Sequence, residues 1–183
     1  SNSLYKYYVL RVCMLWDKSS DNSFSIPTIA CLLESDSVLE KLQKHIFYAN
    51  NTLIEPTNDD EINHLINENQ RKNAEKTSKD CIEKLRNSIE GAKEFANSEE
   101  IKAIKEHRDK YIAHSLTHLT RKKSAKIPYK IGIESIAIKK ACEILDVFEE
   151  AVNCSSFENE AESRRISRRY ANEFWKSIKI NIE

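Results

Sequence analysis

The chain has 183 residues but only two glycines and three prolines. Such low counts leave little turn chemistry for a sheet of many strands, so they favour an all-helical fold. They also exclude the glycine-rich loops that bind phosphate in P-loop and dinucleotide-binding proteins. At this length we expect residues 1–183 to form a single helical domain.

The cysteines are few and scattered. No two of the five form a Cys-x-x-Cys pair: they are Cys13, Cys31, Cys81, Cys142 and Cys154. An odd, dispersed set predicts neither a disulfide framework nor a structural zinc site, and a reducing cytoplasm is its simplest location. No apolar run approaches the ~20 residues of a membrane span, and the N-terminus lacks a signal-peptide pattern. We therefore expect a cytoplasmic protein that does not enter a membrane.

Net charge is also absent, but the charges are unevenly distributed. Residues 1–100 carry 12 basic and 17 acidic side chains, whereas residues 101–183 carry 17 basic and 12 acidic ones. The basic half suits an anionic partner such as RNA.

What the chain does have is apolar side chains at helical spacing. We expect helices over residues 4–16, 59–90, about 98–114, about 134–153 and about 158–178. Two further helices are expected to begin within residues 25–27 and at residue 35 or 36. The long amphipathic helix 59–90 is almost wholly polar between residues 67 and 80, so that part is expected to protrude or kink. The apolar side chains that we expect to be buried include Leu4, Tyr8, Val12, Leu15, Leu32, Ile62, Leu65, Ile136, Ile166, Tyr170, Phe174 and Trp175.

One short run carries most of the candidate chemistry. Residues 106–115 read Glu-His-Arg-Asp-Lys-Tyr-Ile-Ala-His-Ser. Arg108 is a permanent cation that can hold phosphate oxygens with two parallel hydrogen bonds, and His114 can move a proton near neutral pH. Such a pair can cut RNA without a metal: the histidine takes the 2′-hydroxyl proton and the arginine stabilises charge on the phosphate.

The spacing of this pair leaves its geometry open. Six residues advance an ideal helix by about 600°, which leaves Arg108 and His114 roughly 120° apart. Either the helix ends near Ala113 and His114 turns inward, or the site combines residues from two chains. The same residues also fit an ordinary solvated helix face that contains a structural ion pair.

Metal binding is a weaker interpretation of the same region. His114 and His118 are four residues apart and would share a helix face. No further ligand is placed beside them by the sequence. We therefore predict no metal site, and we expect no cofactor.

The run 108–115 resembles the signature of the HEPN superfamily (higher eukaryotes and prokaryotes nucleotide-binding domain). In that signature an arginine is followed by a polar residue, here Asp109, and then by a histidine four to six residues further on. The form Arg-Asp-Lys-x-x-Ala-His-Ser is similar to the AbiU-type abortive-infection branch. Residues 10–17 (Leu-Arg-Val-Cys-Met-Leu-Trp-Asp) and 25–27 (Ser-Ile-Pro) resemble the early segment of that branch.

The resemblance implies a helical bundle that dimerises and often acts as a metal-independent ribonuclease. Such proteins serve in toxin–antitoxin or phage-defence systems, commonly beside a nucleotidyltransferase-type antitoxin. By this resemblance Arg108 would hold the scissile phosphate, His114 would be the general acid or base, and Asp109 would orient one of them. The expected products carry a 2′,3′-cyclic phosphate or 3′-phosphate and a 5′-hydroxyl.

Further cations are expected to guide the RNA backbone without reading its sequence. They are Lys110, Arg121, Lys122 and Lys123.

Two other functions remain open. The chain would be a non-catalytic HEPN module if the groove around Arg108 binds a nucleotide, an RNA or an antitoxin without cutting. It would be a structural or interaction bundle if the polar helix 59–90 serves mainly to contact another protein.

Overall fold

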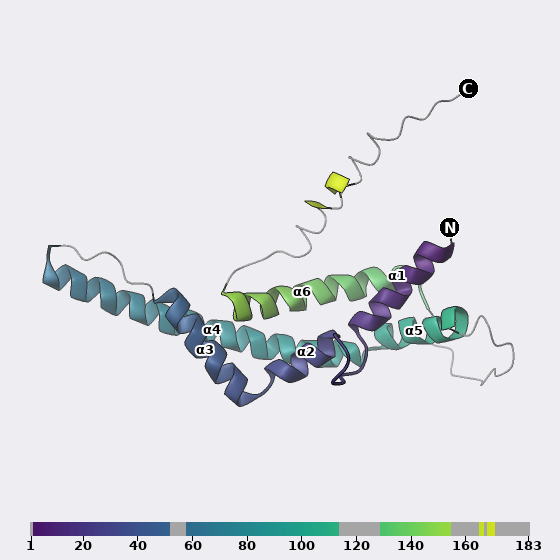
Figure 1. The fold of residues 1–183 in the computed structure, drawn as a ribbon, viewed down its shortest axis with the longest axis horizontal. Coiled ribbons are helices and arrows are strands. Elements are labelled where there is room, and N and C mark those ends of the chain that lie inside the picture. Colours follow the sequence, from purple (N-terminus) through teal and green to yellow (C-terminus); the bar gives the residue numbers. More distant parts are fainter. Residues whose placement is uncertain (1, 52–57, 114–128, 155–164, 167, 171–183) are drawn as a thin grey trace, which may run out of the picture.

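The computed structural model describes residues 2–51, 58–113, 129–154, 165–166 and 168–170. Within these ranges the chain forms helices and connecting loops with no strand, which confirms the all-α fold (Figure 1). The elements are α1 (Asn2–Leu15), α2 (Ile26–Leu33), α3 (Asp36–Asn50), α4 (Asp60–Ala96), α5 (Glu99–His107), η1 (Arg108–Ala113) and α6 (Ile133–Asn153).

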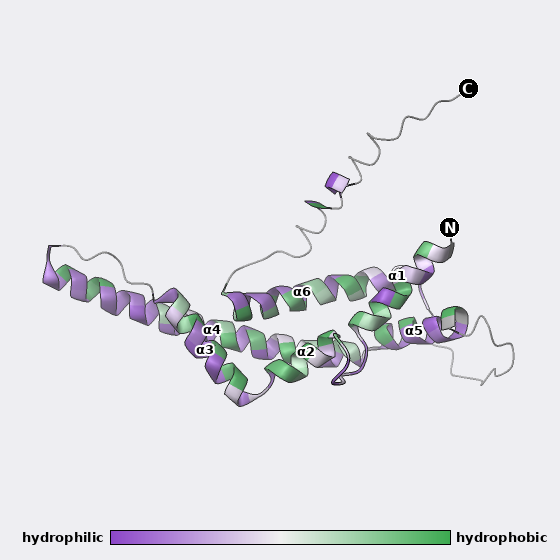
Figure 2. Cartoon of the chain, in the orientation of Figure 1, coloured by the Kyte–Doolittle hydropathy of each residue, from purple (hydrophilic) through white to green (hydrophobic). Residues whose placement is uncertain are grey.

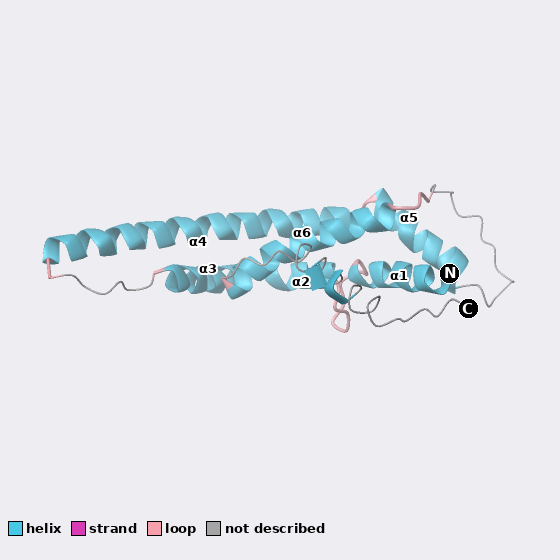
Figure 3. Ribbon diagram, turned by 90° about the horizontal axis from the view of Figure 1, so that it is seen from above, coloured by secondary structure: helices cyan, strands magenta, loops and turns pink. Residues whose placement is uncertain are grey.

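The 37-residue helix α4 is the axis of the bundle. It packs against α2, α3 and α6, while α1 packs against α5, η1 and α6. Figures 1 and 3 show α6 beside the later half of α4, and the beginning of α4 extending past the other helices. The end of the molecule that holds α1, α5 and η1 therefore lies opposite this extension.

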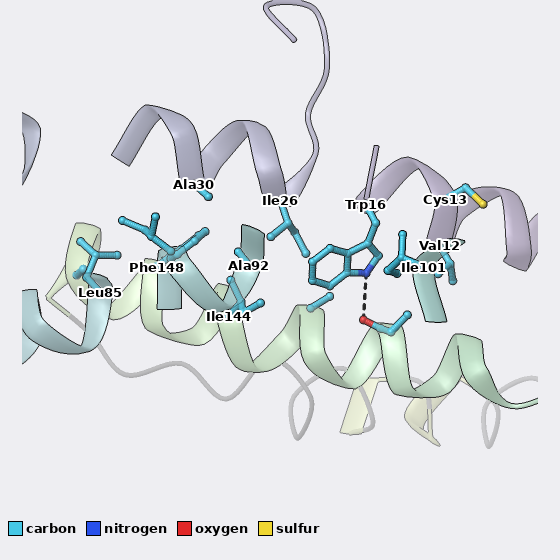
Figure 4. Close-up of a cluster of buried hydrophobic side chains, with 14 of the residues drawn as sticks. Val12, Cys13, Trp16, Ile26, Ala30, Leu85, Ala92, Ile101, Ile144 and Phe148 are labelled. Carbon is cyan, nitrogen blue, oxygen red and sulfur yellow. Dashed lines mark hydrogen bonds between the residues drawn. The ribbon is translucent and has the colours of Figure 1, made fainter. Parts of the chain in front are cut away.

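Trp16 lies at the centre of the core between these two groups of helices (Figure 4). Its indole Nε1 donates a hydrogen bond to the carbonyl of Ala137 at 3.2 Å, and its ring meets Phe95 edge to face at 4.8 Å. A buried indole N–H normally needs such a partner. This contact therefore fixes the end of α1 against both α6 and the end of α4.

Local signals place several helix ends where the sequence predicts them. Ser25 caps α2 by accepting a hydrogen bond from the Thr28 amide, and Pro27 lies in the first turn of that helix. Ser98 caps α5 in the same way. Side-chain oxygens at these positions satisfy amides that a helix leaves without an internal partner. At α4 the cap is Asp59. The sequence allows this helix either to stop at Gly91 or to continue to Phe95, and it continues to Ala96.

The extension of α4 differs in extent from the predicted one. No residue in 60–73 is buried, whereas Ala74 and Ser78 are buried within the polar stretch that we expected to protrude or kink. Small side chains at 74 and 78 allow close packing, so this part of the stretch belongs to the bundle. Figure 2 shows mainly hydrophilic residues along the extension.

Some apolar side chains expected in the core are exposed. Leu4 is 80% exposed, and the others are Leu32, Ile62, Leu65, Ile136, Ile166 and Tyr170. Periodicity identifies the apolar face of a helix but does not supply a neighbour to cover it. Phe174 and Trp175, with most of the predicted helix 158–178, lie outside the described residues. No helix among those described has the length and low charge needed to cross a membrane.

Candidate functional site

Arg108 lies where the motif helix changes its geometry. Helix α5 ends at His107 and continues directly as the π-helical segment η1, so the predicted helix over about 98–114 is continuous as far as it is described. The Arg108 amide donates to the carbonyls of both Ile104 and Lys105. Segments of π-helix occur frequently at functional sites. Ile104 is buried one turn earlier, so Arg108 emerges at the edge of the core.

The Arg108 guanidinium lies between two carboxylates. Its Nε donates to Oδ1 of Asp109 at 2.8 Å, and its Nη1 lies 3.6 Å from Oδ1 of Asp17. The hydrogen bond to Asp109 raises the pKa of Arg108 above its ordinary value, so the side chain stays charged. The Arg108 side chain is 26% exposed. Two carboxylates therefore restrain the guanidinium, and it is still partly accessible to solvent.

The C-terminal end of α1 receives a second cation from α5. The Lys105 ammonium donates to the Trp16 carbonyl at 2.7 Å, and burial lowers the pKa of Lys105. The last carbonyls of a helix lack internal donors and carry partial negative charge, so a lysine there is favourable. This bond fixes the residue before Asp17, and it thereby holds the Asp17 backbone beside Arg108.

Cys13 lies one turn before Asp17 and is almost fully buried. Burial raises the pKa of its thiol to about 11. A thiol with this pKa is protonated at neutral pH and is a poor nucleophile. The site therefore offers charge and hydrogen bonds rather than a reactive sulfur at this position.

The ion pair between Asp17 and Arg108 joins the two sequence segments that carry the resemblance, 10–17 and 108–115. The sequence matches the HEPN AbiU2 family over residues 1–174. The chain belongs to the HEPN AbiU2 family. No curated protein sequence and no solved structure matches it.

Behind the HEPN motif lies a buried carboxylate that sequence analysis did not identify. Glu134 is only 1% exposed. Its Oε1 accepts hydrogen bonds from the hydroxyls of Tyr5 and Tyr129, and its Oε2 accepts one from the Gly132 amide at 2.9 Å. Gly132 is the N-cap residue of α6 and has φ +105°, a conformation that favours glycine. The carboxylate therefore ties α1 to the start of α6.

The electrostatics of this cluster follow from its hydrogen bonds. Burial raises the pKa of Glu134, but the hydrogen bonds from Tyr129, Tyr5 and backbone amides together outweigh this effect and leave the pKa below its ordinary value. Burial, with the bond to Glu134 next, raises the pKa of Tyr129. The cluster is thus a carboxylate held by two neutral phenols.

His107 connects this cluster to Arg108. Its ring stacks on Tyr129 with centroids 4.0 Å apart and an interplanar angle of 10°, and it meets Tyr5 edge to face at 6.3 Å. Burial lowers the pKa of His107, and the charge of Glu134 partly opposes that effect. Since His107 immediately precedes Arg108, these contacts fix the backbone from which the motif arginine extends.

Other predicted site residues of this HEPN chain are placed only in part. The Lys110 ammonium is paired with the Glu106 carboxylate one turn earlier. His114 and the basic cluster Arg121, Lys122 and Lys123 lie outside the described residues. The expected angle of about 120° between Arg108 and His114 assumed an ideal α-helix. The angle stays a prediction, because His114 lies outside the described residues, and the segment from Arg108 to Ala113 is π-helical.

In the part of the chain that the structure describes, no group of three or more His, Cys, Asp or Glu side chains is arranged to hold a metal ion.

Sequence analysis also missed Asp17 and Lys105 as neighbours of Arg108. Asp17 had a signal, because it ends the early segment that resembles the family. Lys105 had none, since its partner is the backbone carbonyl of Trp16, a residue distant in sequence that follows α1.

Proposed function

We propose that this protein is a metal-independent endoribonuclease of a toxin–antitoxin or phage-defence system of the abortive-infection type. The observation that carries the proposal is the charge, exposure and orientation of the Arg108 guanidinium. The motif arginine is charged, partly exposed and oriented by Asp109 at a π-helical segment. A guanidinium held in this way suits a phosphate that gains negative charge as the RNA chain breaks.

In the proposed reaction His114 removes the proton of a ribose 2′-hydroxyl. The 2′-oxygen attacks the adjacent phosphorus, the bond from phosphorus to O5′ breaks, and O5′ takes up a proton. The products are a 2′,3′-cyclic phosphate, which water can open to a 3′-phosphate, and a 5′-hydroxyl. Arg108 holds the phosphate oxygens throughout, and Asp109 keeps the guanidinium aligned.

The partners are part of the same proposal. Lys110 and the cluster of Arg121, Lys122 and Lys123 would attract the RNA backbone, a contribution that weakens as salt is added. We expect a homodimer in the cytoplasm, controlled by a nucleotidyltransferase-type antitoxin. Gel filtration with light scattering checks the dimer, and a strict monomer would contradict it.

Cleavage of labelled RNA in EDTA tests the nuclease proposal. We expect the parent protein to leave cyclic-phosphate ends. Arg108→Ala and His114→Ala are each expected to lower the rate by about 100-fold or more, the usual scale of acid–base and phosphate-stabilising groups. Arg71→Ala and His64→Ala are matched controls, because both residues lie in the exposed extension of α4. Undiminished cleavage by both motif variants would contradict the assigned roles.

A second candidate is a non-catalytic HEPN module that binds RNA, a nucleotide or an antitoxin. The specific observation in its favour is that Arg108 already faces two carboxylates, Asp17 and Asp109. Tight RNA or nucleotide binding by the parent protein, with no product and with loss of binding in Arg108→Ala, would select this function over the nuclease.

A further inference from the structure

An arginine can grip a phosphate with two parallel hydrogen bonds along either of two edges. One edge is formed by Nε and Nη2, and the other by Nη1 and Nη2. In Arg108 the Nε atom donates to Asp109, and Nη1 faces Asp17. Each edge therefore has one of its two nitrogens facing a carboxylate. A phosphate that binds Arg108 along either edge competes with the carboxylate that faces that nitrogen.

The two carboxylates do not hold Arg108 equally. Asp109 is adjacent in sequence and makes a 2.8 Å hydrogen bond. Asp17 comes from another element, lies 3.6 Å away and is 43% exposed. A pair at that distance is an ion pair without a direct hydrogen bond, and a partly exposed one is weak. Asp17 is therefore the partner that an incoming anion can replace.

We infer that Asp17 is a positioning residue that holds Arg108 in the RNA-free protein and that an RNA phosphate displaces it from its place beside Nη1. The inference rests on the proposed function only in taking an RNA phosphate as the ligand. Asp109 remains bonded to Nε during the exchange and keeps the guanidinium oriented.

The surroundings of Asp17 keep it beside the site after displacement. Lys105 anchors the Trp16 carbonyl, so the Asp17 backbone stays near Arg108. An RNA phosphate that binds Arg108 must therefore compete with the Asp17 carboxylate for the guanidinium. This competition weakens binding, and it depends on the Asp17 charge. Removing that charge should therefore strengthen RNA binding through Arg108.

The test compares Asp17→Asn with Asp21→Asn, which makes the same charge change at an exposed site in the same loop. Binding is measured by fluorescence anisotropy with a labelled 2′-O-methyl RNA, which cannot be cut by 2′-hydroxyl attack. We expect Asp17→Asn to lower the Kd about two- to fivefold relative to Asp21→Asn, which is the scale of a partly exposed ion pair. Inorganic phosphate should compete more effectively in the same variant.

Repeating the substitution in an Arg108→Gln background completes a double-mutant cycle. We expect the gain from Asp17→Asn to disappear there, because no guanidinium is left to release. A general electrostatic effect would persist in that background and would overturn the inference. Equal affinities for Asp17→Asn and Asp21→Asn would also overturn it. Thermal unfolding checks that each variant folds, and Asp17→Ser is a second variant if Asp17→Asn does not.

The failures of the two proposals are distinguishable. If the parent protein does not cut natural RNA but the binding cycle behaves as expected, the nuclease proposal fails and the role of Asp17 stands. If Arg108→Ala abolishes cleavage but the cycle shows no coupling, the role of Asp17 fails and the nuclease stands. If the parent protein binds neither the RNA nor inorganic phosphate, both fail.

Discussion

Two regions of the molecule use charged residues in opposite ways. At the junction of α1, η1 and α6, which holds Trp16, Arg108 and Glu134, charges contact groups from other helices and several are buried or half-buried. In the extension of α4, residues 60–73, no side chain is buried. Packing between helices, rather than helix formation itself, therefore produces the perturbed pKa values at the junction.

Local interactions support the extension. Asp59 caps α4 by accepting hydrogen bonds from the Glu61 and Ile62 amides. Lys72 pairs with Glu68 one turn away at 2.7 Å. Each contact joins residues no more than four apart, so a single helix could make them without the bundle. By contrast, the junction exists only in the folded protein.

The largest expected effect that would sharpen this comparison comes from Trp16→Ala. Losing a buried indole and leaving a cavity should lower the free energy of unfolding by about 3–5 kcal/mol. Urea denaturation measures the change. Trp16→Phe is the control: it keeps an aromatic ring but not the bond to Ala137, so its loss should be clearly smaller. A loss below about 1 kcal/mol for Trp16→Ala would show that the junction is not a cooperative part of the core.

An intermediate effect is expected for Glu134→Gln. At neutral pH the variant should lose about 1–3 kcal/mol, because the hydroxyls of Tyr5 and Tyr129 lose a charged acceptor. The pKa of Glu134 is lowered in the folded state, so the stability it supplies is complete above the unfolded pKa of about 4.3. That stability is lost as the pH falls through the lower folded pKa.

Urea denaturation at several pH values checks this dependence. The difference in stability between parent and Glu134→Gln should therefore shrink as the pH is lowered below about 4. Glu143→Gln, at an exposed position of the same helix, should show no comparable trend. An equal difference for Glu134→Gln at low and neutral pH would mean that the carboxylate charge is not what the two tyrosines stabilise.

The smallest effect is expected in the extension. Asp59→Ala removes a helix cap worth about 1 kcal/mol locally. Because no residue in 60–73 is fully buried, the substitution should speed amide exchange at Glu61 and Ile62 and barely change the global unfolding transition. Hydrogen exchange with mass spectrometry or NMR measures both. A fall in global stability as large as that of Trp16→Ala would break the distinction between the two regions.

Prediction from sequence succeeded where neighbours along the chain decide the outcome. Ser98 and the Ser25–Pro27 segment begin helices because their side chains and backbone act within one turn. It failed at Leu4 and Ile62, which lie on apolar faces yet are exposed. Whether such a face is buried depends on a second helix, and periodicity carries no information about that helix.

The same division holds at the candidate site. Asp109 was predicted to orient Arg108 or His114, and its carboxylate accepts a hydrogen bond from Arg108 in the structure. Their catalytic roles, and that of His114, stay predictions. Asp17 was only part of a family resemblance, and Glu134 carried no signal at all. Nothing near Glu134 in the sequence indicates that Tyr5, from a distant helix, will join the nearby Tyr129 at its carboxylate.

The sequence by itself determined the helical class, most helix starts and the presence of a charged arginine motif, because these depend on residues within about one turn of each other. The tertiary structure decided which charges face Arg108 and which carboxylate is buried. Asp17 reaches Arg108 only when α1 packs on α5 and η1. Glu134 keeps its charge in the core because Tyr5, Tyr129 and the Gly132 amide donate hydrogen bonds that replace water.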